Sequence, residues 1–370
     1  MRLGIHRLLD SAPVGKRLGL VTHPAAVLPD LTLGLDALLA AGQPVVAVFG
    51  AEHGLRGTGQ AGESEDATVD EVTGLPVYDT YRHGFADALA DSGIDVLLVD
   101  LQHVGARFYT YESTLYDAIA AAAAAGVRIH VLDRPNPAGG VEVGGPVLNP
   151  EFASFVGRAP IPMRHGLTMG ELARLFASLH GAPVPEVATM DGWTRSRRFD
   201  ATGLPWVPPS PNLPTAASAL TYLGTCLFEG TNLSVGRGTT TPFEVVGAPF
   251  LDRALVEALR AQALAGTAFR ECAFTPAFDV HAGERLPGLA VHVLDADAFD
   301  PIRTALTMLT TIAALYPGAL EFRESAFDRL CGDDAVRKAI CAGASADEII
   351  SSWSPGLISF EATRDSLVLY

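Results

Sequence analysis

The sequence is short of cysteine and of positive charge. Only four of its 370 residues are cysteines, and none forms a Cys-x-x-Cys pair or a zinc-finger spacing. We therefore expect reduced thiols rather than a disulfide scaffold. Lys and Arg total 26 against 42 Asp and Glu, which gives a net charge of −16. This balance argues against nucleic acid or an anionic membrane surface as the main partner.

The sequence also lacks a long hydrophobic run. The longest, residues 118–126, is mostly alanine, and it is far shorter than the roughly 20 residues that cross a bilayer. The first residues show neither an apolar signal-peptide core nor a small-residue cleavage site. We therefore expect no membrane insertion and a cytoplasmic location, while export of a longer precursor stays open. The sequence does not indicate an oligomeric state.

What the chain does have is a regular alternation of strands and helices in its first 135 residues. Near-continuous apolar strands joined by helices are typical of a parallel sheet that is covered on both faces. We therefore predict an α/β fold with a doubly wound parallel sheet. The strands are expected at 17–22, 44–49, 95–100 and 127–132, and the helices at 33–41, 84–92 and 112–125.

The chain is long enough for two domains of about 150–200 residues each. Residues 205–214 are rich in proline, which fixes φ and lacks an N–H, so this segment is expected to be an extended connector. We divide the chain there into a doubly wound domain, 1–215, and a smaller α+β domain, 216–370. Helices are expected from the capping boxes Thr168–Glu171 (ending near Gly181) and Ser345–Glu348, from Asp300 with Pro301, and over 252–265, with strands near 270–274 and 288–294.

Polar clusters follow all four predicted strands of the first domain. They occupy residues 22–24, 50–57, 100–111 and 133–137. Ligands of open parallel sheets bind beyond the carboxyl ends of the strands, so these clusters predict one shared polar crevice. The alternative is that they are ordinary caps and surface charges.

Glu52 and His53 form the most distinctive pair. A carboxylate on a glycine-flanked loop at the mouth of a sheet can be partly desolvated, which suits a general acid. His53 would orient that carboxylate or bind substrate. Asp100 and Asp133 each end a buried strand, where an aspartate either contacts substrate or caps loop amides.

A second polar segment, 229–244, is dense in Gly, Thr, Ser and Asn. Its amides and hydroxyls suit hydrogen bonding to a polyhydroxylated ligand. Arg237 lies between two glycines, where its guanidinium could approach a carboxylate closely and bind it through two hydrogen bonds. The alternative is a long turn region.

Several chemistries are absent from the sequence. There is no phosphate-binding G-x-x-x-x-G-K-[ST] loop, no dinucleotide-binding G-x-G-x-x-G after the first strand, no G-x-S-x-G and no H-E-x-x-H. The ten histidines show no metal-ligand spacing. We therefore expect no cofactor and no metal. Acid/base chemistry by carboxylates remains, with arginines to hold an anionic substrate.

Longer strings point to one family. They are residues 52–57, 73–78, 100–111, 132–137, 162–166, 203–212 and 229–241. On these strings the chain resembles the NamZ family of exo-β-N-acetylmuramidases, glycoside hydrolase family 171, from about residue 18 to 370. The family's Pro-Glu-His-Gly motif, which holds its catalytic carboxylate, matches residues 51–54 with Ala51 in place of proline. Residues 22–25 and 281–288 also depart from the family pattern, which concerns the exact substrate more than the reaction class.

The resemblance implies a Rossmann-like domain, a smaller C-terminal domain and an active site in the cleft between them. It also implies release of N-acetylmuramic acid from the non-reducing ends of peptidoglycan fragments, in cell-wall turnover and recycling. Two alternatives are another amino-sugar glycosidase or ether-cleaving enzyme on the same scaffold, and a non-catalytic sugar-binding protein. The sequence does not give retention or inversion of the anomeric configuration.

The candidate site residues follow from both arguments. Glu52 and His53 are the catalytic candidates. The lactyl carboxylate of muramic acid calls for a basic pocket, for which Arg107, Arg134, Arg164 and Arg237 are the candidates. The full set expected to bind substrate is Asp100, Arg107, Tyr109, Asp133, Arg134, Asn136, Arg164, His165, Asn212, Glu229, Asn232 and Arg237.

Overall fold

The computed structural model describes residues 1–65 and 68–370, and the chain divides into two compact units. The first unit comprises Met1–Glu142, His165–Pro211 and Ala362–Tyr370. The second comprises Val143–Arg164 and Asn212–Glu361. One change of unit falls inside the proline-rich segment. The division at residue 215 stays a prediction.

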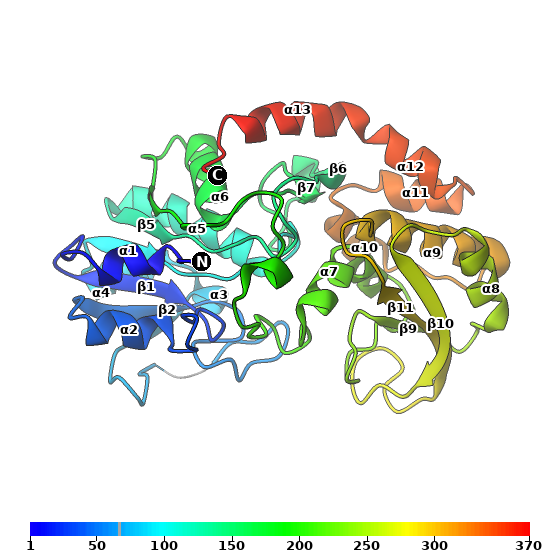
Figure 1. Ribbon diagram of the computed structural model, residues 1–370, viewed down its shortest axis with the longest axis horizontal. Coiled ribbons are helices and arrows are strands. Elements are labelled where there is room, and N and C mark those ends of the chain that lie inside the picture. Colours follow the sequence, from blue (N-terminus) through cyan, green and yellow to red (C-terminus); the bar gives the residue numbers. More distant parts are fainter. Residues whose placement is uncertain (66–67) are drawn as a thin grey trace. The chain divides into compact units, whose positions relative to one another are not determined.

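The first unit is built on a six-stranded parallel sheet, with the strand order β3-β2-β1-β4-β5-β8 (Figure 1). The four strands predicted from the sequence form its centre, and every residue of β1 and β4 is buried. The predicted doubly wound parallel sheet is thereby confirmed. The strands are β1 Leu18–Thr22, β2 Val45–Gly50, β3 Val77–Asp79, β4 Val96–Val99, β5 Arg128–Leu132 and β8 Glu186–Ala188.

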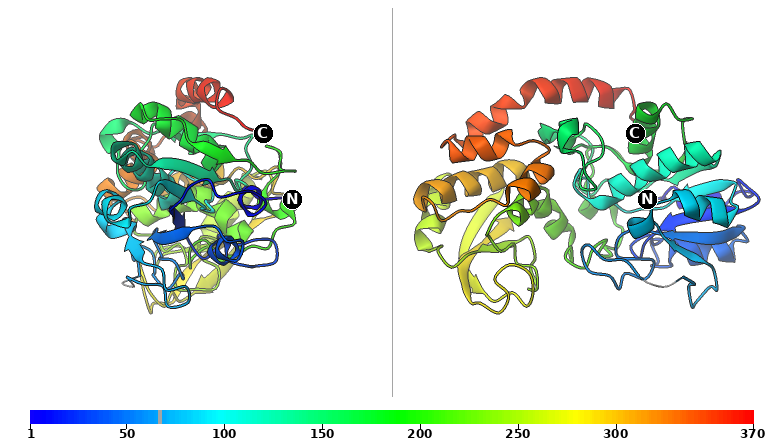
Figure 2. Two further views of the ribbon diagram at one scale, coloured as in Figure 1. Left: turned by 90° about the vertical axis from the view of Figure 1, so that its left-hand side faces the viewer. Right: turned by 180° about the vertical axis from the view of Figure 1, so that it is seen from behind.

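Helices cover both faces of this sheet (Figure 1, Figure 2). One layer holds α1 and α2, which pack against each other, and the other holds α4, α5 and α6, in which α5 contacts both neighbours. The predicted capping box of Thr168 and Glu171 opens α6. The bounds are α1 Ile5–Leu9, α2 Gly34–Ala40, α3 Thr80–His83, α4 Ala86–Ser92, α5 Thr110–Ala125 and α6 Met169–His180, with a 3₁₀ turn at Phe199–Thr202.

The second unit has an antiparallel sheet, ordered β10-β11-β9, and a separate pair of strands, β6 and β7. The helices α7, α8 and α9 pack on this sheet or on one another. The strands are β6 Gly144–Val147, β7 Pro162–Arg164, β9 Val245–Gly247, β10 Thr267–Phe274 and β11 Leu286–Val293. The helices are α7 Ala216–Thr225, α8 Arg253–Ala261, α9 Pro301–Leu315, α10 Glu324–Cys331, α11 Ala335–Cys341, α12 Ala346–Ser352 and α13 Ser354–Asp365, with 3₁₀ turns at Pro150–Phe152 and Cys226–Gly230. The last residues of α13, from Ala362, belong to the first unit.

The start signals of the second unit are confirmed, and one helix end is not. Asp300 caps α9 through the N–H groups of the residues that follow, and Ser345 and Glu348 form the capping box of α12. The helix expected over 252–265 ends at Ala261, because Ala263 takes a left-handed φ of 49° that an α-helix cannot contain. No helix in the described part of the chain is both long and apolar enough to cross a membrane.

Candidate active site

The loop that follows β2 carries Glu52 and His53, both buried. His53 has a φ of 74°, in the left-handed region that non-glycine residues seldom occupy. Its backbone N–H donates to the Glu63 carbonyl at 2.9 Å. Its ring Nδ1 lies 3.1 Å from the Gly59 carbonyl oxygen and 3.2 Å from that of Gln60. Because a carbonyl only accepts, Nδ1 of His53 carries a proton.

The Glu52 carboxylate is surrounded by hydrogen-bond donors. Oε1 accepts the Gly62 N–H at 2.6 Å, and Oε2 accepts the Thr110 hydroxyl at 2.5 Å. The Tyr81 hydroxyl also donates to this carboxylate, and burial together with the Glu52 charge raises the pKa of Tyr81 to about 12. Thr110 is the first residue of α5, so the positive end of that helix dipole lies beside Glu52. These donors fix the position of the carboxylate.

The packed rings of Tyr111 and His23 lie next to Glu52. The Tyr111 hydroxyl lies 3.3 Å from the backbone carbonyl oxygen of Glu52 and 3.1 Å from that of Pro209. The His23 ring packs 4.6 Å from the Tyr111 ring, and its Nε2 accepts the Gln102 N–H. Burial, and then the Arg134 charge, hold the pKa of His23 well below its usual value. His23 is therefore a neutral imidazole packed against Tyr111.

Two of the predicted substrate-binding residues, Asp100 and Arg134, pair with each other. Arg134 donates from Nε to Oδ1 of Asp100 at 2.5 Å and from Nη2 to Oδ2 at 3.0 Å, while its Nη1 donates to the Val27 carbonyl. Both side chains are buried, so this two-bond pair ties the end of β4 to the loop after β5. Their contact with substrate stays a prediction.

Asp133 and Asn136 also hold the fold together. The Asp133 carboxylate accepts the Gly170 N–H at 2.8 Å and the hydroxyls of Thr168 at 2.7 Å and Tyr370 at 2.8 Å. Burial raises the pKa of Asp133 to about 6. Asn136 donates to the Leu167 carbonyl. For Asp133, the capping arrangement weighed for strand-end aspartates is the one present.

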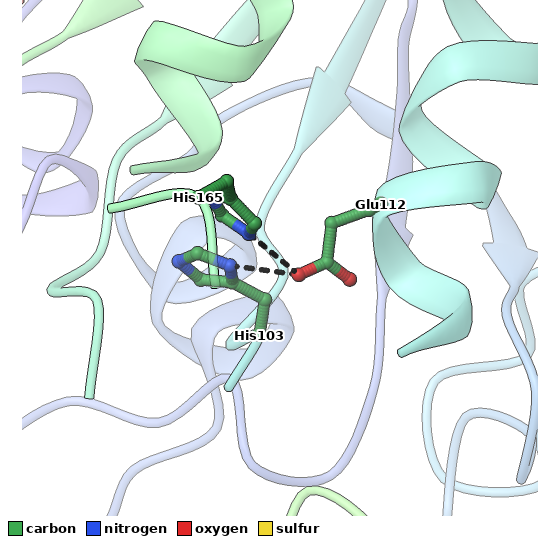
Figure 3. Close-up of side chains that lie close together, drawn as sticks. All are labelled: His103, Glu112 and His165. Carbon is green, nitrogen blue, oxygen red and sulfur yellow. Dashed lines mark hydrogen bonds and ion pairs between the residues drawn. The ribbon is translucent and has the colours of Figure 1, made fainter. Parts of the chain in front are cut away.

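The other candidates of the first unit are Arg107, Tyr109 and His165. Arg107 is buried, and the Tyr109 hydroxyl donates to the Pro209 carbonyl at 2.8 Å. His165 joins His103 and Glu112, two residues that the sequence reasoning missed. Their His and Glu ligand atoms lie within 4.8 Å of one another, close enough for a metal ion by distance alone (Figure 3).

The proton positions argue against a metal there. The Leu167 N–H donates to Nδ1 of His165 at 3.1 Å. Burial lowers the pKa of His165, so the ring is neutral and its one proton sits on Nε2, facing Glu112. A metal ligand needs a lone pair on that nitrogen. The expected absence of a metal stays a prediction, with this geometry in its favour.

The remaining candidates belong to the second unit. Arg237 forms an ion pair through Nε with Glu229, and its guanidinium lies 5.1 Å from the Phe243 ring centre. Its Nη1 is buried and has no hydrogen-bond partner among the described residues. Gly238 has a φ of 77°, and a Cβ there would come within 2.6 Å of the Ala277 nitrogen. The glycine is therefore required by the chain itself, and close approach of a ligand is not needed to explain it.

Three further candidates of the second unit are Arg164, Asn212 and Asn232. Arg164 and Asn212 are buried. The Asn232 amide donates to the Ala319 carbonyl and accepts the Glu321 N–H, so it ties down the loop before α10. Sequence reasoning missed Thr110, Tyr81 and Tyr111 around Glu52. No spacing signal marks them, because their partner lies tens of residues away in the chain.

Comparisons with known proteins agree along the whole chain. Residues 18–217 match the family described as "Exo-beta-N-acetylmuramidase NamZ, N-terminal", and residues 220–370 match its C-terminal counterpart. The "Peptidoglycan beta-N-acetylmuramidase NamZ" of Bacillus subtilis (strain 168) is 44% identical over 363 residues, which cover 96% of this chain and 87% of that protein.

Two solved structures from Bacteroides fragilis NCTC 9343 share the fold, both described as DUF1343 family proteins. One (BF0371) superposes with a TM-score of 0.90 at 31% identity, and the other (BF0379) with 0.81 at 30%. Each comparison covers 100% of this chain and 98% of the other.

Proposed function

Because the chain belongs to the NamZ family of exo-β-N-acetylmuramidases, as its sequence strings predicted, we propose that it releases N-acetylmuramic acid from the non-reducing ends of peptidoglycan fragments. A relative named for this activity on peptidoglycan is similar over nearly the whole chain. The observation that carries the proposal within this chain is the buried Glu52 carboxylate with its three donors. A role in cell-wall turnover and recycling and a cytoplasmic location stay predictions.

The donors around Glu52 bear on its chemical role. Hydrolysis breaks the bond between the anomeric carbon and the bridging oxygen, adds a water oxygen to that carbon, and delivers a proton to the departing sugar. A carboxylate that accepts hydrogen bonds from several donors is positioned to accept a proton from water or to attack the anomeric carbon. The general-acid role expected from the sequence stays a prediction, and we propose from these contacts that Glu52 acts as base or nucleophile. Another group must supply the proton.

The lactyl carboxylate separates muramic acid from N-acetylglucosamine. Nη1 of Arg237 is buried and has no hydrogen-bond partner in the part of the chain that the structure describes. An unpaired guanidinium N–H in a buried position gains a charge-assisted hydrogen bond from a ligand carboxylate. Arg134, by contrast, already uses Nε, Nη1 and Nη2 within the fold. We therefore favour Arg237 over Arg134 as the reader of the lactyl group, with Arg107 and Arg164 as the other candidates.

The proposed activity is tested with a pair of chromogenic β-glycosides, one of N-acetylmuramic acid and one of N-acetylglucosamine, and with a peptidoglycan oligosaccharide. The expected result is turnover of the muramyl glycoside and release of single N-acetylmuramic acid units from the oligosaccharide. Turnover of only the glucosaminyl glycoside would indicate a different glycosidase. Binding of the sugars without turnover would indicate a sugar-binding protein.

A further inference from the structure

Glu112 lies in the first turn of α5, and its buried carboxylate faces two histidines (Figure 3). Its Oε1 lies 3.1 Å from Nδ1 of His103 and 3.4 Å from Nε2 of His165. His103 belongs to the loop after β4, and His165 to the segment that leads into α6. Three stretches of the first unit therefore meet at one carboxylate.

Both histidines point a donor at this carboxylate. Nε2 of His165 carries its proton, because Nδ1 of that ring accepts the Leu167 N–H. Oε1 of Glu112 accepts this bond, so Nδ1 of His103 donates to it as well. A buried carboxylate at the N-terminus of a helix is also favoured by the helix dipole. The arrangement is therefore a clamp on the first turn of α5 through Oε1 of Glu112, whereas Oε2 of Glu112 and Nε2 of His103 are buried without a hydrogen-bond partner among the described residues.

The same turn carries the contact to Glu52. Thr110 and Glu112 are two residues apart in α5, a spacing at which helical side chains point to different sides. The Thr110 hydroxyl reaches Oε2 of Glu52, while the Glu112 carboxylate reaches the histidines. The turn is thus fixed on one side and in contact with the candidate catalytic carboxylate on another.

We propose that Glu112, with His103 and His165, is a positioning cluster for Glu52. It holds the first turn of α5 so that the Thr110 hydroxyl and the helix N-terminus meet the Glu52 carboxylate. The proposal rests on the proposed catalytic role of Glu52. In this proposal the three residues act through Thr110, and the substrate contact expected of His165 stays a separate prediction. A displacement of about 1 Å at a reacting group can lower a rate by ~10²-fold, so a small movement of this turn has a measurable effect.

The test is a double-substitution cycle in kcat and KM on the muramyl glycoside, with Thr110→Val, Glu112→Gln and both together. Each single change is expected to lower kcat by roughly 10- to 100-fold with little change in KM. If Glu112 acts through Thr110, Glu112→Gln costs much less, about 3-fold or below, once Thr110 is already valine. Multiplicative losses in the double variant would overturn the proposal.

Matched variants separate positioning from general damage. Thr110→Ser keeps the hydroxyl and is expected to keep kcat near that of the wild type. Glu186, at the start of β8, is another carboxylate that faces a histidine, with Oε2 3.2 Å from Nδ1 of His130. Glu186→Gln is therefore the control, and it is expected to leave kcat unchanged. His103→Asn keeps a donor for Glu112 and is expected to retain kcat, whereas His103→Leu lowers it. An equal loss in both His103 variants would mean that His103 acts through its own ring, against the proposal.

A readout without turnover keeps this inference separate from the proposed function. Amide hydrogen exchange in the first turn of α5 is expected to accelerate in Glu112→Gln and to stay unchanged in Glu186→Gln. Unchanged exchange in Glu112→Gln would contradict the positioning role, whatever substrate the protein takes. If the wild type fails on the muramyl glycoside but the exchange result holds, the proposed function fails and the clamp stands.

Discussion

The Thr110 hydroxyl, at the start of α5, donates a 2.5 Å hydrogen bond to Oε2 of Glu52, in the loop after β2. The contact joins residues 58 positions apart. It forms because β2 and β4 are both neighbours of β1, in the same parallel sheet, so that their following loops leave from one edge. The positive end of the α5 helix dipole and the buried Glu52 carboxylate are thereby brought together, an arrangement that stabilises the negative charge.

His53 has a left-handed backbone that its substitution can test. Asn tolerates this conformation, whereas a β-branched residue does not. We expect His53→Val to lower the free energy of unfolding by about 1–3 kcal/mol more than His53→Asn does. Urea unfolding of both variants measures the difference. Equal losses would show that the ring contacts, and not the backbone, set the stability of this loop.

The buried pair of Asp100 and Arg134 predicts strong coupling. Arg134→Met leaves a buried carboxylate without its partner, which typically costs about 3–5 kcal/mol. Adding Asp100→Asn removes that uncompensated charge, so the double variant is expected to be more stable than Arg134→Met alone. Denaturant unfolding of the four proteins in the cycle measures this. A double variant less stable than either single one would contradict the ion-pair account.

Asp133 makes stability depend on pH in a defined direction. Burial raises its pKa in the folded protein from about 3.8 to about 6, so the folded state holds the proton more tightly than the unfolded chain. The stabilisation from this group is therefore complete below about pH 4 and is lost as the pH rises through 6. The loss lowers the free energy of unfolding by about 1–3 kcal/mol.

Asp133→Asn removes that titration. Relative to the wild type, we expect the variant to gain stability between pH 4 and pH 7 and to show no further relative change above it. Urea unfolding at several pH values measures the difference between the two proteins. A difference that stays constant from pH 4 to 7 would show that Asp133 does not titrate in this way.

Arg237 is expected to set the preference for muramyl over glucosaminyl substrates. Arg237→Ala removes the buried guanidinium, and a site built for a charged group discriminates against ligands that lack it. We expect at least a 10-fold fall in the ratio of kcat/KM for muramyl over glucosaminyl glycosides. Arg107→Ala tests the other arginine in the same way. Arg134→Lys is the control, because the Arg134 guanidinium already donates to groups within the fold, and it is expected to leave the ratio unchanged. If both alanine variants keep the wild-type ratio, Arg164 becomes the candidate.

The central strands were predictable, and the edge strands were not. β1, β2, β4 and β5 are apolar runs buried on both faces, which leaves a clear pattern in the sequence. β3 and β8 have three residues each, too few for any periodicity. The end of α8 was misplaced because nothing in the sequence marks Ala263 for a left-handed conformation.

The site was predictable only at its most distinctive residue. Glu52 stood out through its glycine-flanked loop and the family motif, both of which are local. Its donors, Thr110 and Tyr81, are ordinary residue types, whose role depends on the fold that brings them to Glu52. The same limit applied to Asp100 and Arg134, which were both identified but not as partners of each other.

The most direct test of the account is Glu52→Gln, assayed on two muramyl glycosides, one with a good and one with a poor leaving group. A base or nucleophile is needed whatever the leaving group, so we expect a loss of kcat of about 10³-fold or more on both substrates. Wild-type-like unfolding of the variant is the control for folding. A variant that hydrolyses the good leaving group at close to the wild-type rate would contradict the assignment and return Glu52 to the role of general acid.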